Sequence, residues 1–188
     1  MSASTPNLSE NYTAPRWAWW VATGLGSGRL KPAPGTWGSL AGSLAWFDVV
    51  ASGSLLSAIA FEWFLGCMSV AIVFVSIVAA GLVVRQVGES DPSYIVSDEW
   101  AGVWLALWPV RHYALEVACD PWGNWKPAIM GIFAAFLLFR LFDIWKPWPI
   151  RKLEALPGGW GVTLDDVGAG IMAGLLLYCL MAFLSWFV

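Results

Sequence analysis

The sequence predicts an all-α fold, a polytopic membrane helical bundle of about four to five hydrophobic helices. Composition supports this prediction, because 59% of the 188 residues are hydrophobic, only 12% are charged and the mean hydropathy is +0.65. Soluble domains carry about 25% charged residues, which their surfaces need in water. The chain also contains uncharged stretches of the roughly 20 residues that a helix needs to cross a bilayer.

The chain divides into a polar tail and one apolar domain. Residues 1–15 carry no Lys or Arg and so lack the basic start of a secretory signal. Residues 16–188 suit a single membrane-embedded domain. The net charge of −3 gives no reason to expect a nucleic-acid partner. The three cysteines are far apart and form no CxxC motif, which predicts free thiols rather than a disulfide framework.

Three segments have the length and apolarity of membrane spans. Residues 63–84 and residues 167–188 contain no charged residue. Residues 127–145 are apolar until Arg140 and Asp143, which lie near the end of the segment. This segment starts with a proline, which suits a first helical turn, and a Pro-Trp-Pro run follows it and stops the helix. We therefore expect a helix in each of the three segments.

Two further segments leave the number of spans open. Residues 36–57 are apolar except for Asp48, which would lie near the middle of the membrane at a cost of roughly 3 kcal/mol unless shielded. Residues 100–118 begin with an apolar run but meet charged residues from Arg111 onward. Each segment fits a full span and equally fits a short, tilted or interfacial helix.

The basic residues predict the orientation of the bundle if all five segments cross. The loops then alternate, with residues 1–35, 85–99 and 146–166 on one face and residues 58–62 and 119–126 on the other. The first face takes eight basic residues and the second takes two: Arg16, Arg29, Lys31, Arg85, Arg140, Lys146, Arg151 and Lys152 against Arg111 and Lys126. Because cytoplasmic loops carry the excess of Lys and Arg, the first face is predicted to be cytoplasmic.

A glycine- and proline-rich loop on that face is a candidate phosphate site. It spans residues 24–39, contains Arg29 and Lys31, and runs into a helix start where Thr36 or Ser39 is a candidate N-cap. Backbone N–H groups at a helix start, beside two cations, suit a phosphate. The loop alone fits a flexible entry to the membrane equally well.

Three other clusters bring acids to predicted helix ends on the same face. Acids at a helix start can be simple capping residues, and a spacing of three places side chains on one helical stripe. The clusters are Asp98 and Glu99 at the start of the 100–118 segment, Arg140, Asp143 and Lys146 at the end of the 127–145 segment, and Asp165 and Asp166 opening the 167–188 segment. Taken together they favour a functional site, because ionisable residues at membrane depth are costly and usually functional.

The grouping of acids and cations predicts metal-assisted chemistry on a phosphate. Bunched carboxylates repel one another unless a divalent cation lies between them, and oxygen-only ligands are typical of Mg²⁺. Such a metal polarises phosphoryl oxygens and activates water, while Arg and Lys hold the substrate. The sequence contains no CxxxxxR or DxDx[TV] motif, and its single histidine, His112, lies on the other predicted face. The prediction at this point is metal-assisted chemistry on a phosphate that uses neither Cys nor His.

Four stretches carry motifs of a known family. They are residues 26–39 with Pro-Gly-Thr-Trp-Gly-Ser, 95–102 with Ser-Asp-Glu-Trp-Ala-Gly, 139–151 with an FR-x-x-D-x-x-KP-x-P run, and 158–170 with Leu-Asp-Asp-Val-Gly-Ala-Gly. In these stretches the chain resembles the phosphatidylglycerophosphatase A family. The one departure noted is Ser97, where a larger apolar residue is often found.

This resemblance implies an enzyme and its setting. The enzyme would be a multi-pass protein of the bacterial inner membrane with its site facing the cytoplasm. It would hydrolyse phosphatidylglycerophosphate to phosphatidylglycerol and phosphate with Mg²⁺. Carried over by position, the catalytic and metal-binding residues would be Asp98, Glu99, Asp143, Asp165 and Asp166, and the phosphate-binding residues would be Arg29, Lys31, Thr36, Ser39, Arg140 and Lys146.

Two alternatives stay open. One is a phosphatase of another membrane lipid, such as phosphatidate or a polyprenyl phosphate. The other is a non-catalytic membrane protein that binds or carries cations. A carrier is expected to have polar groups near the middle of the membrane, where broken helices meet. Residues 63–84 and 167–188 are instead uncharged throughout, which favours chemistry at the membrane surface.

Overall fold

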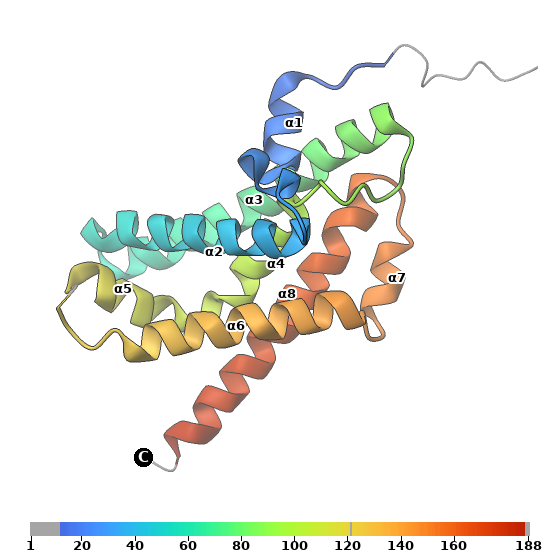
Figure 1. The fold of residues 1–188 in the computed structure, drawn as a ribbon. Helices are drawn as coiled ribbons and strands as arrows, with labels where there is room; N and C mark the ends of the chain where they lie inside the picture. Colours follow the sequence, from blue (N-terminus) through green and yellow to red (C-terminus); the bar gives the residue numbers. More distant parts are fainter. Residues whose placement is uncertain (1–11, 121, 187–188) are drawn as a thin grey trace, which may run out of the picture.

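The computed structural model describes residues 12–120 and 122–186, and this part of the chain is all α, with no strand (Figure 1). The predicted fold class is confirmed. Three short 3₁₀ helices, Gly24–Arg29, Gly53–Leu55 and Trp108–Val110, connect some of the α-helices in these residues. The α-helices are α1 (Arg16–Ala22), α2 (Pro34–Ser52), α3 (Ala58–Val87), α4 (Ser97–Ala106), α5 (Arg111–Cys119), α6 (Lys126–Trp145), α7 (Ile150–Glu154) and α8 (Gly159–Ser185).

Within the described residues, three helices are long and apolar enough to cross a membrane, namely α3, α6 and α8. Helices α3 and α6 contain the expected segments 63–84 and 127–145, and α8 contains residues 167–185 of the third segment. However, α8 begins at Gly159, so the expected helix start near residue 167 was wrong. Asp165 and Asp166 therefore lie in the second turn of a helix rather than at its opening. The first two turns of α8 contain glycines and polar residues, so an apolar pattern does not reveal them as helical. Several of these residues are buried against neighbouring parts of the protein.

The two uncertain segments have different outcomes. Residues 36–57 fall mostly within α2, which is 19 residues long and is not one of the three candidate spans. Residues 100–118 do not form one helix. Instead α4 ends at Ala106, and α5 begins at Arg111 after the 3₁₀ turn that contains Pro109. Proline lacks the backbone N–H that a continuing helix needs, so the break falls where the chain cannot extend α4 unchanged.

The connections place four helix ends together. The starts of α2, α4 and α8 and the end of α6 meet at one end of the bundle, to the right in Figure 1. Helix α5 and the start of α3 lie at the opposite end, to the left. There Glu62 accepts a hydrogen bond from Arg111 at 3.0 Å and lies 3.2 Å from His112. His112 thus lies at the opposite end of the bundle from Asp98, Glu99 and Asp166, which agrees with the face predicted from the sequence.

The packing of α4 against α8 brings the acidic residues together. The two helices cross at Gly102 and Gly170, where a Cβ on Gly170 would overlap the carbonyl oxygen of Gly102. Only glycines allow two helix backbones to approach this closely. Asp98 lies one helical turn before Gly102, and Asp166 lies one turn before Gly170. The crossing therefore places the two acidic turns beside each other.

Candidate active site

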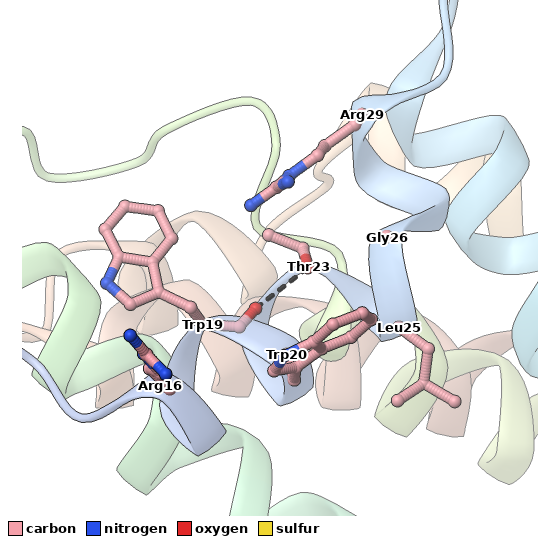
Figure 2. Close-up of a pocket in the computed structure, with 7 residues that line it drawn as sticks. All are labelled: Arg16, Trp19, Trp20, Thr23, Leu25, Gly26 and Arg29. Carbon is pink, nitrogen blue, oxygen red and sulfur yellow. Dashed lines mark hydrogen bonds between the residues drawn. The ribbon is translucent and has the colours of Figure 1, made fainter.

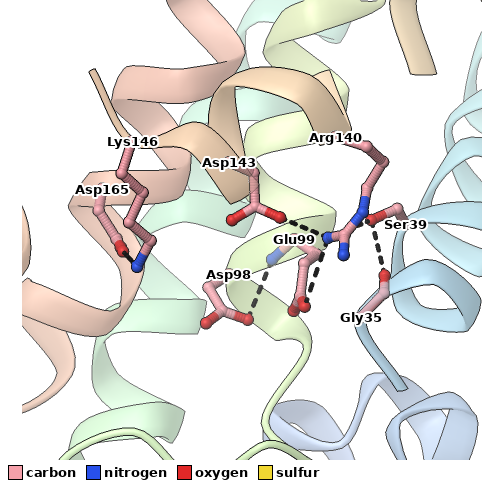
Figure 3. A network of polar contacts seen from close by, with 8 residues as sticks. All are labelled: Gly35, Ser39, Asp98, Glu99, Arg140, Asp143, Lys146 and Asp165. Carbon is pink, nitrogen blue, oxygen red and sulfur yellow. Dashed lines mark hydrogen bonds and ion pairs between the residues drawn. The ribbon is translucent and has the colours of Figure 1, made fainter. Parts of the chain in front are cut away.

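Carboxylates from two helices form the centre of the candidate site. Carboxylate oxygens of Asp98, Glu99 and Asp166 all lie within 4.8 Å of one another. Asp98 and Asp166 are only 6% and 4% exposed. Asp98 Oδ1 accepts a hydrogen bond from the backbone N–H of Glu99 at 3.0 Å (Figure 3). Glu99 Oε2 is buried and has no hydrogen-bond partner among the described residues. A buried carboxylate oxygen without a partner is costly, so this atom fits a site for a cation.

Burial changes the protonation of the two α4 acids, which lie outside the three candidate spans. The pKa of Glu99 is raised to about 8, mainly by burial, with the charges of Asp166 and Asp143 contributing and a hydrogen bond with Asp98 opposing the rise. Burial also raises the pKa of Asp98 well above its usual range, with the charge of Glu99 adding to the effect. Neighbouring carboxylates in a low-dielectric site cannot all ionise without a cation between them. The donor set therefore suits a hard divalent cation that takes oxygen ligands.

Arg140 connects the acids to two other helices. Its Nη1 forms an ion pair with Asp143, lies 3.9 Å from Glu99 Oε1 and donates a hydrogen bond to Ser39 Oγ at 3.5 Å (Figure 3). Gly35 on α2 leaves room for this group, because a Cβ there would overlap Glu99 Oε1 and lie 3.2 Å from both guanidinium nitrogens. The guanidinium is thus held at the edge of the carboxylate cluster, where it can contact an anionic ligand.

Lys146 has different partners from those that its spacing suggests. Helix α6 ends at Trp145, and Lys146 adopts a left-handed conformation at the C-cap with φ 44°. Its Nζ lies 2.6 Å from Asp165 Oδ2 and 3.0 Å from Glu154 Oε1. Burial lowers the pKa of Lys146, but these two carboxylates outweigh that effect and raise it. The expected stripe is therefore right for Arg140 and Asp143 and wrong for Lys146, because the helix stops one residue earlier.

The structure brings part of the predicted phosphate-binding set to the acids. Ser39 lies beside Arg140, but its hydroxyl donates to the carbonyl of Gly35 at 2.7 Å and does not cap the helix. The N-cap of α2 is Ala33, so the prediction of Thr36 or Ser39 as a cap was wrong. The reason is Pro34, whose fixed φ and missing N–H suit the first helical position.

Arg29 and Lys31 lie outside the cluster. Both line a cavity of about 540 Å³ with Trp19, Tyr94 and Pro34, the residue next to Gly35. Arg29 also lines a second cavity of about 420 Å³ with Arg16, Trp20 and Thr23, where Thr23 Oγ1 donates to the Trp19 carbonyl at 2.8 Å (Figure 2). In residues 12–120 and 122–186, no ion pair joins Arg29 or Lys31 to an acid.

A buried hydroxyl network supports the acidic turns and is not evident from the sequence. Ser76 Oγ on α3 donates to Ser97 Oγ at 3.0 Å and lies 3.1 Å from Thr163 Oγ1. Ser97 precedes Asp98 on α4, and Thr163 lies one turn before Asp166 on α8. The network explains the small polar residue at position 97. A lone serine in an apolar helix does not reveal its partners 21 and 87 residues away.

The fold and the site together define a class of protein. The chain is an all-α membrane-type bundle that gathers carboxylates and cations at one end, an arrangement suited to chemistry on an anionic group. The sequence pattern of the phosphatidylglycerophosphatase A family matches residues 20–181. The chain therefore belongs to this family of phosphoric monoester hydrolases.

Individual relatives agree with the family match. A protein of Bacteroides thetaiotaomicron, provisionally named a phosphatidylinositol-3-phosphatase, is 40% identical over 84% of this chain and 89% of its own length. A phosphatidylglycerophosphatase A of Haemophilus influenzae is 38% identical over 85% of this chain and 86% of its own. A phosphatidylglycerophosphatase A of Escherichia coli is 31% identical, over 84% and 80% respectively. No solved structure matches the chain.

Proposed function

We propose that the chain is a Mg²⁺-dependent lipid phosphatase that hydrolyses phosphatidylglycerophosphate to phosphatidylglycerol and phosphate. The observation that carries the proposal is the buried triad of Asp98, Glu99 and Asp166 next to Arg140. The substrate is the one in the names of the Haemophilus influenzae and Escherichia coli relatives. The proposal also explains why so many ionisable groups lie at one end of an apolar bundle.

The proposed roles follow from the contacts. Asp98, Glu99 and Asp166 would hold the metal, which when bound neutralises phosphoryl charge and activates water. Arg140 and Lys146 would bind phosphate oxygens, with Ser39 adding a hydroxyl and Thr36 lying one turn earlier on α2. Asp143 and Asp165 would orient the two cations through their ion pairs.

The reaction breaks the phosphorus–oxygen bond to glycerol. The oxygen of water becomes bonded to phosphorus, and the proton that water loses is taken up by the glycerol oxygen. Attack by a carboxylate, followed by hydrolysis of the acyl phosphate, gives the same products and uses the same side chains.

The placement in the cell is part of the proposal. Residues 16–188 would form one domain in the bacterial inner membrane, with the site on the cytoplasmic side. Support comes from the eight-to-two division of basic residues and from the three candidate spans. Arg29 and Lys31 would contact the anionic headgroup as it approaches, since their cavity shares Pro34 with the start of α2.

Phosphate release by the purified protein tests the proposal. We expect release from phosphatidylglycerophosphate with Mg²⁺ and none in EDTA. Phosphatidate, a polyprenyl phosphate and phosphatidylinositol 3-phosphate are the comparison substrates. The last is included because the Bacteroides thetaiotaomicron relative carries its name. Preference for a comparison substrate would overturn the assigned headgroup, and full activity in EDTA would overturn the metal.

A further inference from the structure

An apolar groove runs between α2 and α6 and ends at the candidate site. Its volume is about 470 Å³, and its lining includes Trp37 and Leu40 on α2 and Ile129, Phe133 and Phe136 on α6. The two helices run alongside each other in Figure 1. Leu40 and Phe133 are 43% and 61% exposed, so the groove opens to the exterior of the bundle. Among its lining residues, the side chains with polar atoms are Thr36 and Ser43, each with a hydroxyl, and Trp37, with an indole N–H.

The groove is continuous with the polar cluster. Phe136 lies one helical turn before Arg140 on α6, and Thr36 follows Gly35 on α2. The Arg140–Ser39 hydrogen bond joins the two helices at this end of the groove. Ile129 and Phe136 are seven positions apart on α6, a rise of about 10 Å at 1.5 Å per residue. A cation and carboxylates at one end and an apolar channel behind them match the two parts of an amphiphile.

We propose that this groove holds an acyl chain of the lipid whose phosphate lies at Arg140 and the carboxylates. This inference rests on the proposed function and adds to it that the enzyme recognises its substrate through an acyl chain as well as through the headgroup. A peptide is a poor occupant, because its backbone groups would find few partners on these apolar side chains. An acyl chain has no polar group to satisfy.

A second apolar groove provides a comparison within the same molecule. It has a volume of about 340 Å³ and is lined by Leu105, Pro109, Ile171 and Leu175. Its lining includes Arg111, which pairs with Glu62 at the far end of the bundle, whereas the lining of the first groove includes Thr36, next to Gly35 at the acidic end. Bulk lipid is expected to cover both grooves equally. A substrate chain is expected only in the groove that leads to the acids.

The groove is expected to orient the substrate more than to attract it. Lipid tails are as apolar as the side chains, so moving a chain from the bilayer into the groove has little hydrophobic driving force. A chain held there fixes the approach of the headgroup to Arg140. Filling the groove should therefore impair turnover of long-chain substrate and leave the deacylated headgroup unaffected.

The kinetic test compares two tryptophan substitutions. Leu40→Trp fills the first groove, and Leu175→Trp, at a residue 62% exposed in the second groove, is the matched control. For long-chain phosphatidylglycerophosphate we expect Leu40→Trp to lower kcat/KM about tenfold, the equivalent of about 1.4 kcal/mol. We expect no change for deacylated headgroup or for Leu175→Trp. An equal loss on both substrates, or no loss on either, would overturn the proposal.

A photolabelling experiment tests whether an acyl chain occupies the groove, and it does not require turnover. Phosphatidylglycerophosphate with a photoreactive acyl chain should label residues 36–43 and 129–136 of the protein in nanodiscs. Unlabelled phosphatidylglycerophosphate should compete, and phosphatidylcholine should not. Labelling of residues 171–178 to the same extent, or equal competition by both lipids, would show that the first groove is covered by bulk lipid and would overturn the proposal. If unlabelled phosphatidylglycerophosphate competes with the labelling but the protein releases no phosphate, the acyl-chain site is supported and the proposed reaction is rejected.

Discussion

At the scale of single residues, the five acids of the site fall into two groups. Asp98, Glu99 and Asp166 face one another without a cation partner close to all three among the described residues. Asp143 and Asp165 each pair closely with one cation, Arg140 and Lys146 respectively. A triad of this kind is suited to bind a metal, while the paired acids are suited to orient the cations. Substitutions in the two groups should therefore have different effects.

Asp143→Asn should abolish hydrolysis while the protein stays folded. The change removes the charge that holds Arg140 beside Glu99, so the guanidinium is no longer fixed for phosphate. Turnover and melting temperature in the same detergent check this prediction, with exposed Asp48→Asn as the control. If the loss of the ion pair unfolds the protein, at a cost of roughly 3–5 kcal/mol, Asp143 is structural instead.

Metal removal should give the protein a pH-dependent stability. Glu99, with its pKa raised to about 8, and Asp98 hold protons in the folded metal-free protein that the unfolded chain releases near pH 4. Folding then takes up protons, so stability in EDTA should fall as the pH rises from about 5 to about 8. Bound Mg²⁺ would replace these protons, so stability in Mg²⁺ should not decrease over this pH range.

Melting temperatures from pH 5 to 9, in EDTA and in Mg²⁺, measure this effect. Glu99→Gln is the matched variant, because its amide does not titrate, so the curve in EDTA should be less steep, with Asp98 supplying the remaining slope. A curve in EDTA that is already flat for the unmodified protein would show that these carboxyls are ionised without metal.

At the scale of elements, the sequence predicts the helices well and their ends less well. The apolar runs of α3 and α6 and the proline after α6 are local signals, and each gave the right helix. The start of α8 is polar and glycine-rich, and it is helical because α3 and α4 pack against it. The pairing of Lys146 with Asp165 depends on where α6 stops, which a spacing rule cannot supply. The acids themselves were predictable, whereas their division into triad and ion pairs was not.

Helix α2 should tolerate no side chain at position 35. Gly35→Ala adds a Cβ that meets Glu99 and Arg140, so it should displace both groups and lower kcat by one to two orders of magnitude. Gly66→Ala on α3 is the control, because its Cβ would lie 3.7 Å from Trp108 in ordinary contact, and alanine favours the helix by up to about 1 kcal/mol. Normal turnover in Gly35→Ala would place the phosphate away from this edge.

At the scale of the whole molecule, charge is divided between the two ends. The acidic cluster, Arg140 and Lys146 lie at one end, and the Glu62–Arg111 pair lies at the other. Helix α1 joins the first end, because the Gln86 side chain at the end of α3 accepts hydrogen bonds from Ala14 and Trp19. The basic asymmetry that the sequence shows is thus an asymmetry of the folded bundle.

This asymmetry predicts that the acidic end faces the cytoplasm, and cysteine labelling can test it. Ser90→Cys and Ala155→Cys place exposed thiols in the loops after α3 and after α7, at the end that holds the site. Each thiol is introduced into a protein whose three natural cysteines have been replaced. An impermeant maleimide added to intact cells should not label either thiol until the membrane is opened. A separate protein that keeps only Cys119, which is exposed at the end of α5, is the control for the opposite side. Its thiol should react before the membrane is opened.

The physical reason is that cytoplasmic loops retain Lys and Arg, and eight of the ten basic residues lie at or beyond the helix ends on this face. Labelling of position 90 or 155 from outside, with Cys119 protected, would show that the bundle has the opposite orientation in the membrane. It would also separate the site from a lipid phosphate supplied on the cytoplasmic side. Labelling of both position 90 and Cys119 from outside would instead show that the broken α4–α5 segment does not cross, since this segment alone separates the two positions.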